Sequence, residues 1–171
     1  MRNSLHQAQA VAVSLILALS VSVSHAQMMR SDLRGDLGWR TYADRDSGVR
    51  VDFPARLFPV DAGEPDRGVG RIFETEDGRA RFSAYSLENE ANDTPQSYLR
   101  KYLKVDTSKI DYRRVTNRFF VVSGVQNGNV YYSRCNFRGR MHCIYMSYPA
   151  PEVRAWDNIV TRVSLSLRAL P

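Results

Sequence analysis

Histidine is scarce in this chain. His6 and His25 lie close to the start, and His142 stands alone in the remainder. An imidazole can act as a general base when a partner orients it and a pocket holds a nucleophile or substrate beside it. The chain contains no G-x-S-x-G, H-E-x-x-H or P-loop pattern. His142 therefore supports only an alternative hypothesis, a small hydrolase-type envelope enzyme, and the competing interpretation is a residue on the surface of a strand.

Carboxylates offer a second route to the same chemistry. Glu74 and Glu76 are spaced to share one face of a strand, as a general acid and base would require, although a solvated strand edge and turn explain them better. The acidic loop 61–66 departs from the spacing of calcium-binding loops. One histidine and a pair of cysteines cannot supply a zinc site if those cysteines are oxidised. We therefore assign no catalytic residue, no metal and no cofactor.

Arginine and tyrosine form the more prominent cluster. Both residue types are common at binding surfaces, although arginines on strands also simply face solvent. All but three of the 24 basic residues of the chain are arginines. The candidate binding surface comprises Arg113, Arg114, Arg118, Arg134, Arg138, Arg140 and His142, and Tyr112, Tyr131, Tyr132, Tyr145 and Tyr148 are interleaved with them.

The two cysteines predict a hairpin with a disulfide bond. Cys135 and Cys143 lie four residues to either side of Gly139, and the flanking runs are rich in β-branched and aromatic residues. Residues equidistant from a hairpin loop face each other, close enough for a disulfide bond. Such bonds persist in oxidising compartments.

The beginning of the chain predicts export. Met1–Ala26 has a basic residue, Arg2, then a mostly apolar run, and it ends in Ser24-His25-Ala26, as a cleaved signal peptide does. The apolar run is too short for a membrane-spanning helix. Removal of the signal peptide takes away one basic and no acidic residue, so the net charge of the chain changes from +6 to +5. We expect a periplasmic or secreted protein with no transmembrane segment in its mature part, which excludes nucleic acid as a partner.

The rest of the chain predicts one domain, residues 38–171, after a flexible lead-in over residues 27–37. Strands are expected over 38–43, 49–53, 71–76, 79–87, 110–115, 118–125, 129–137 and 141–148, and 61–70 reads as a loop. Asp77-Gly78 and Asn127-Gly128 are two-residue turn signals. The second turn and the cysteine hairpin together pair Val125 with Val130 and Cys135 with Cys143.

Two helices are expected to cover the sheet. Thr94-Pro95 provides a cap and a proline at the first helical position, and an apolar stripe follows that includes Tyr98, Leu99 and Leu103. A second stripe marks a C-terminal helix over Glu152–Ala169. The predicted fold class is α+β, an antiparallel β-sheet of hairpins and a meander flanked by helices, with the C-terminal helix packed on the sheet.

This order of elements resembles a known group of proteins. The stretches Tyr132–Phe137 and Ala155–Arg168 resemble small exported alphaproteobacterial proteins, and the whole of 38–168 is similar, more distantly, to the PsbP-like fold. That resemblance implies an antiparallel sheet between helices and a role in binding and stabilising protein assemblies, with no catalytic residue carried over.

The functional expectation is a non-catalytic exported binding or assembly module. Its partner would be an envelope protein or an anionic envelope component, bound through the arginine-rich strands. Two alternatives stay open: the envelope enzyme described above, and a small-ligand carrier with an aromatic pocket between the sheet and a helix.

Overall fold

The structure, a computed structural model, describes residue 33 and the ranges 35–102 and 109–171. The predicted signal peptide, residues 1–26, and Leu103 of the first helical stripe lie outside the described residues. Residues Leu37–Pro171 form one compact unit, and the account below concerns that unit.

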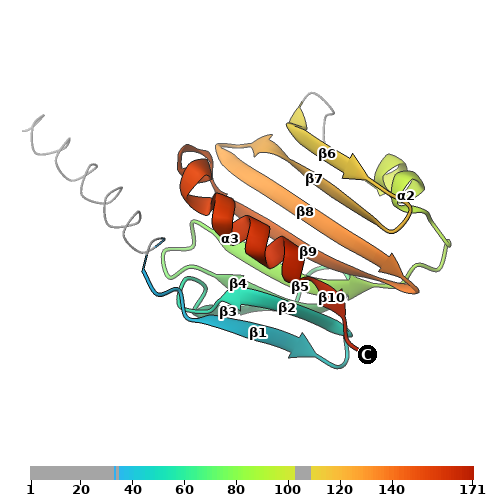
Figure 1. Ribbon diagram of the computed structural model, residues 1–171, viewed down its shortest axis with the longest axis horizontal. Coiled ribbons are helices and arrows are strands. Elements are labelled where there is room, and N and C mark those ends of the chain that lie inside the picture. Colours follow the sequence, from blue (N-terminus) through green and yellow to red (C-terminus); the bar gives the residue numbers. More distant parts are fainter. Residues whose placement is uncertain (1–32, 34, 103–108) are drawn as a thin grey trace, which may run out of the picture. The chain divides into compact units, whose positions relative to one another are not determined.

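A seven-stranded antiparallel sheet dominates this unit (Figure 1). Its strands follow the order β3-β4-β5-β9-β8-β7-β6. The bounds are β3 (Val60–Gly63), β4 (Val69–Glu74), β5 (Arg81–Leu87), β6 (Tyr112–Val115), β7 (Phe119–Gln126), β8 (Asn129–Arg138) and β9 (Arg140–Pro149). The predicted α+β class with an antiparallel sheet and a C-terminal helix is confirmed.

The register of the central hairpins follows from their turns. Asn127 and Gly128 both adopt positive φ angles, 51° and 79°, as a tight two-residue hairpin turn requires. Val125 therefore pairs with Val130, and Cys135 pairs with Cys143, as predicted. Because side chains alternate along a strand, this register also decides which residues share a face of the sheet.

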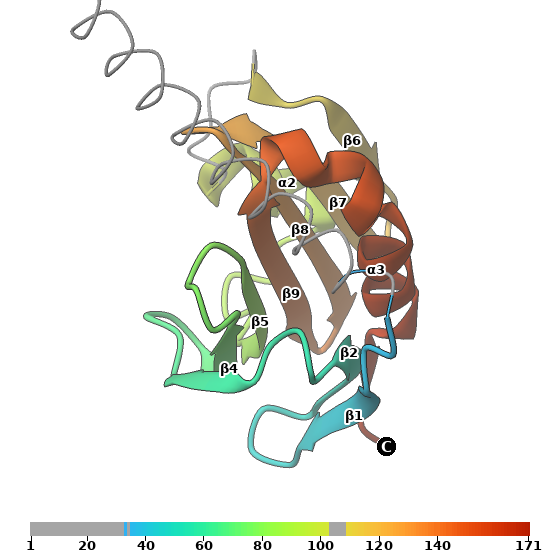
Figure 2. The same ribbon diagram turned by 90° about the vertical axis from the view of Figure 1, so that its left-hand side faces the viewer.

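One face of the sheet, here called the α3 face, is covered by a helix and a second, smaller sheet. The helix is α3 (Val153–Ser166), which follows the 3-10 turn η2 (Ala150–Glu152) and lies against β8 and β9. The small sheet has the order β1-β2-β10, with β1 (Trp39–Asp44), β2 (Val49–Pro54) and β10 (Arg168–Ala169). Figure 2 shows α3 and this small sheet on the same side of β9.

Aromatic side chains fill the space beneath these two covers. Phe53 of β2 stacks on Phe73 of β4 at 4.9 Å between ring centroids, and Phe82 lies 5.7 Å from Phe53. Trp156 of α3 is fully buried and stacks on Tyr148 at 4.8 Å. This core joins α3, the small sheet and the large sheet.

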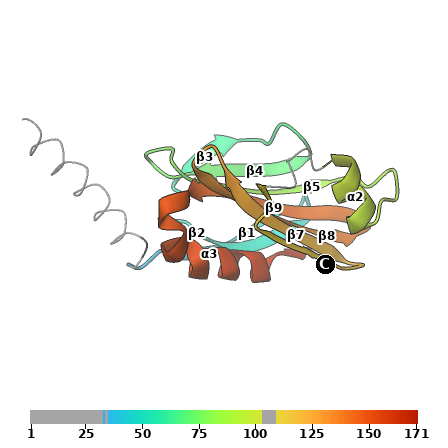
Figure 3. The same cartoon turned by 90° about the horizontal axis from the view of Figure 1, so that it is seen from above.

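The opposite face, here called the α2 face, is covered near the hairpin tip by α2 (Pro95–Tyr102), seen beside the ends of β7 and β8 in Figures 1 and 3. Thr94 caps this helix, because its Oγ1 accepts a hydrogen bond from the Ser97 amide at 3.1 Å. Leu99 packs into a buried cluster with Phe120 and the Cys135–Cys143 disulfide. The predicted disulfide is present.

Two segments differ from the sequence-based expectation. The predicted loop 61–70 contains most of strand β3 and the beginning of β4, since β4 pairs with β5 and β3 pairs with β4, which extends the sheet into a glycine-rich stretch. The C-terminal helix ends at Ser166, where Leu167 turns to an extended conformation and β10 pairs with β2. In both cases the strand forms because it pairs with a segment that is distant in the sequence. The local sequence preferences of the segment do not indicate that pairing.

Candidate binding surface

The outer strands β6, β7 and β8 bring two predicted arginines together on the α3 face. Arg114 on β6 pairs with Val121 on β7, and Val121 pairs in turn with Arg134 on β8. The two arginines therefore occupy the same cross-strand row. Phe119 lies beside them. The Arg114 guanidinium carbon is 5.6 Å from the centre of the Phe119 ring, and that of Arg134 is 4.8 Å from it. We call Arg114, Phe119 and Arg134 the Arg–Phe–Arg cluster.

Arg134 is held in place by its neighbours. Its Nε donates to Asn136 Oδ1 at 3.1 Å, and its Nη1 donates to Ser164 Oγ of α3 at 3.3 Å. The same Ser164 hydroxyl lies 2.6 Å from the hydroxyl of Tyr132. Helix α3 thereby fixes one guanidinium while Arg114, on the edge strand β6, remains exposed.

No carboxylate neutralises this cluster within the described part of the chain. Among the described residues, ion pairs such as those of Arg79, Arg81, Lys101 and Arg140 involve neither Arg114 nor Arg134. Burial lowers the pKa of Arg134, and repulsion from the Arg114 guanidinium lowers it further. Burial also raises the pKa of Tyr132, so that hydroxyl stays neutral. The cluster is a positive site that an anion can complete.

The other predicted surface residues are distributed more widely. Arg113 lies on the α2 face, where its Nη2 donates to Gln96 Oε1 at 3.2 Å, and Arg118 is exposed just before β7. Arg138 is exposed at the tip of the disulfide hairpin. Arg140 is engaged within the chain, with Glu88 at 2.6 Å and the Asp46 carbonyl at 3.0 Å. The arginines are therefore not brought into one continuous cluster.

His142 lies beneath the turn between β1 and β2. It is 5% exposed, and a Cβ atom on Gly48 of that turn would approach its Cε1 to 3.4 Å. Ser86 lies opposite His142 on the adjacent strand β5 and is 1% exposed. Neither Ser86 Oγ nor His142 Nδ1 has a hydrogen-bond partner. The pair has the residue types of a nucleophile and a base, but both side chains are closed off from solvent.

Acid is expected to destabilise the protein through His142. Burial, and secondarily the charge of Arg140, lowers the pKa of this imidazole below its ordinary value. Between that lowered pKa and about 6.5, the unfolded chain binds more protons than the folded one, so the free energy of unfolding falls as the pH falls. Urea unfolding at about pH 7.5 and about pH 5 should show a larger loss in wild type than in His142→Gln. Equal losses would remove this role for His142.

Glu74 and Glu76 do not form a pair on one strand. Strand β4 ends at Glu74, which is bonded to Arg81 across the hairpin, and Glu76 lies in the exposed turn. The turn is organised instead by Thr75, whose hydroxyl donates to Asp77 Oδ1 at 2.7 Å.

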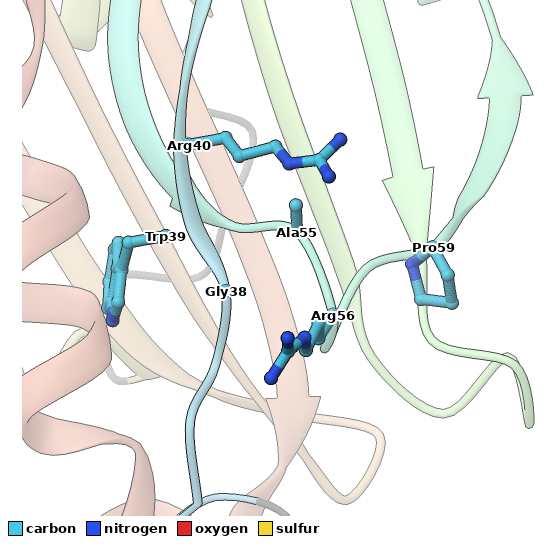
Figure 4. A pocket seen from close by; sticks show the side chains of 6 residues that line it. All are labelled: Gly38, Trp39, Arg40, Ala55, Arg56 and Pro59. Atoms are coloured by element: carbon cyan, nitrogen blue, oxygen red, sulfur yellow. The ribbon is translucent and has the colours of Figure 1, made fainter.

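Two pockets lie elsewhere on this unit. The first is lined by Gly38, Trp39, Arg40, Ala55, Arg56 and Pro59 (Figure 4). Figure 4 shows the Trp39 and Arg40 side chains on opposite sides of β1, and Trp39 lies under the Arg162 guanidinium at 4.0 Å. The second pocket, of about 310 Å³, lies between α2 and the sheet and includes Tyr98 and Tyr102. Most of the residues that line it belong to the segment 87–93 before α2, and the small-ligand alternative stays a prediction.

Among the described residues, no helix is long and apolar enough to span a membrane. In the same part of the chain, no group of three or more histidine, cysteine or acidic side chains is arranged to hold a metal ion.

The fold defined by these sheets and helices is PsbP-like. The chain is similar to the solution structure of cyanobacterial PsbP (CyanoP) from Synechocystis sp. PCC 6803, with a TM-score of 0.59 and 13% identity over 77% of this chain and 92% of that one. A crystal structure from Bacteroides thetaiotaomicron VPI-5482 matches with a TM-score of 0.48 and 9% identity, over 77% of this chain and 48% of that one. No protein-family model and no curated protein matches the sequence. The predicted distant likeness to the PsbP-like fold is confirmed, and it concerns the fold alone.

Sequence reasoning did not single out Phe119 and Ser164 as parts of the candidate surface. A signal for Phe119 exists, because the predicted register places it on the same face as Val121 and Tyr132. Nothing local indicates that Ser164 reaches Arg134, since that contact depends on how α3 crosses the sheet.

Proposed function

We propose that the mature chain is an exported, non-catalytic binding module that contacts an envelope protein or an anionic envelope component. The Arg–Phe–Arg cluster carries this proposal. Two guanidiniums share one aromatic ring, one of them fixed by Ser164 and Asn136, and neither is paired with a carboxylate of the described chain. Arginine and aromatic residues in such an arrangement are characteristic of binding surfaces.

The proposed location outside the cytoplasm has its own support. The disulfide between Cys135 and Cys143 is buried in the cluster beneath α2, and disulfides of this structural kind persist where thiols are oxidised. The sequence of residues 1–26 fits a cleaved leader. We therefore place the mature chain, beginning near Gln27, in the periplasm or outside the cell.

The proposal is tested by capture from an envelope fraction. Chemical crosslinking followed by mass spectrometry would compare wild type with Arg114→Glu/Arg134→Glu. We expect recovery of the partner to fall at least about tenfold, because both favourable charges become repulsive.

A matched control is available on the two helices. Arg100→Glu/Arg154→Glu changes the net charge by the same amount at two exposed positions, one on α2 and one on α3. Equal loss of the partner in both double variants would show a nonspecific effect of charge and would contradict the assignment of the surface.

A further inference from the structure

The outer edge of β6 is unpaired in the described part of the chain. Strand β6 ends the order of the large sheet and pairs only with β7. The Thr116 amide donates to the Phe119 carbonyl at 2.9 Å in the turn that joins the two strands. Backbone N–H and C=O groups alternate in direction along a strand. Because the Thr116 amide points toward β7, the backbone groups of Arg114 and Tyr112 point toward β7 as well. Arg113 and Val115 then direct their N–H and C=O groups outward.

An open strand edge selects for one kind of partner. An extended polypeptide can add to it through main-chain hydrogen bonds, whereas a lipid headgroup or a phosphate polymer has no such ladder to form. In an added strand, the side chain opposite Arg114 would lie on the α3 face, next to the Arg–Phe–Arg cluster. The side chain two residues along would lie opposite Tyr112, which is 49% exposed.

Charge decides what the side chain opposite Arg114 must be. The guanidinium of Arg114 has no hydrogen bond or ion pair in the described structure beyond its contact with the Phe119 ring, and Arg134 keeps donors beyond those given to Asn136 and Ser164. A carboxylate placed there would accept from the Arg114 guanidinium, and the positive charge of Arg134, which contacts the same Phe119 ring, would add to the attraction. Tyr112 in turn favours an aromatic or β-branched neighbour across the strand pair.

We propose that the partner is an acidic segment of another polypeptide, which adds to β6 as an extra strand and places a carboxylate on Arg114, beside the Arg–Phe–Arg cluster. This inference rests on the proposed function and narrows it to one class of partner. The phenol ring of Tyr112 would then pack on an apolar side chain of the same segment.

Purified protein and a short synthetic peptide that places a glutamate and a valine two residues apart, so that both lie on one face of the added strand, would test this. We expect binding by titration calorimetry, and at least about a tenfold loss of affinity when glutamine replaces glutamate or when the protein carries Arg114→Gln/Arg134→Gln. Arg114→Gln alone, at an exposed position, keeps the test valid if the double variant folds poorly. The matched control Arg100→Gln/Arg154→Gln should leave the affinity unchanged.

A second peptide separates strand addition from simple charge attraction. Methylation of alternate backbone amides of the same acidic peptide removes the donors that a strand ladder needs while keeping every carboxylate. We expect binding to be lost, and unchanged binding would overturn the strand geometry.

Polyphosphate and phosphatidylglycerol vesicles complete the test. If either binds while the acidic peptide does not, the inference of a polypeptide partner is wrong. If the envelope partner is captured through Arg114 and Arg134 but the peptide fails to bind, this inference fails and the proposed function stands.

Discussion

Replacing Trp156 with alanine is expected to lower the free energy of unfolding by about 3–5 kcal/mol. The side chain is fully buried, stacks on Tyr148 and lies 5.9 Å from the Phe58 ring. Its Nε1 also donates to Glu152 Oε2 at 3.2 Å. Alanine would leave a cavity where α3 meets the large sheet. Urea unfolding with linear extrapolation measures the loss.

The same helix supplies a control for this variant. Leu165 is 72% exposed, so Leu165→Ala should change the free energy of unfolding by no more than about 0.5 kcal/mol. Similar losses in the two variants would mean that Trp156 does not anchor α3. The prediction bears on the binding surface because α3 carries Ser164, which orients Arg134.

Removing the disulfide is expected to cost about 2–4 kcal/mol. The bond links Cys135 and Cys143 on neighbouring strands and closes a short loop. Because the loop is short, the loss of entropy that the bond imposes on the unfolded chain is modest. Both cysteines are buried against Leu99 and Phe120, so Cys135→Ala/Cys143→Ala also loses packing. Urea unfolding of this double variant beside oxidised wild type gives the difference.

Unfolding in the presence of a reductant separates the contribution of the disulfide cross-link from the contribution of side-chain packing. The reductant should destabilise wild type and leave the alanine variant unchanged. Two free thiols in protein recovered after export would contradict both the bond and the compartment proposed for the chain.

The parts of the fold that could be predicted are those encoded by neighbouring residues. Asn127-Gly128 sets the β7–β8 register through its positive φ angles, and the symmetric cysteines set the β8–β9 register. Thr94-Pro95 marks the beginning of α2 because it supplies a cap and a fixed φ. Each of these signals acts within a few residues.

The parts that could not be predicted depend on pairing between distant segments. Strand β10 exists because residues 168–169 reach the edge of β2, and β3 exists because its partner β4 lies beside it. Ser86 and His142 become neighbours only when β5 pairs with β9. Short segments rich in glycine or polar residues carry little of this information themselves.

The candidate surface shows the same division. Arg113 and Arg114 are adjacent in sequence, yet strand alternation places them on opposite faces, so a cluster in sequence does not become a cluster in space. Arg114 and Arg134 meet because two consecutive registers align them, and Phe119 completes the cluster. The β7–β8 register was predictable from Asn127-Gly128, whereas the β6–β7 register and the position of α3 over Arg134 were not.

Photocrosslinking in living cells tests the central claim most directly. A photoreactive amino acid would replace Tyr112, beside the Arg–Phe–Arg cluster, and in a control would replace the exposed Arg154 of α3. We predict a covalent adduct with an envelope component from position 112, absent from position 154 and lost with Arg114→Glu/Arg134→Glu. An adduct from position 154 alone, or one at position 112 that survives the double charge reversal, would contradict the account.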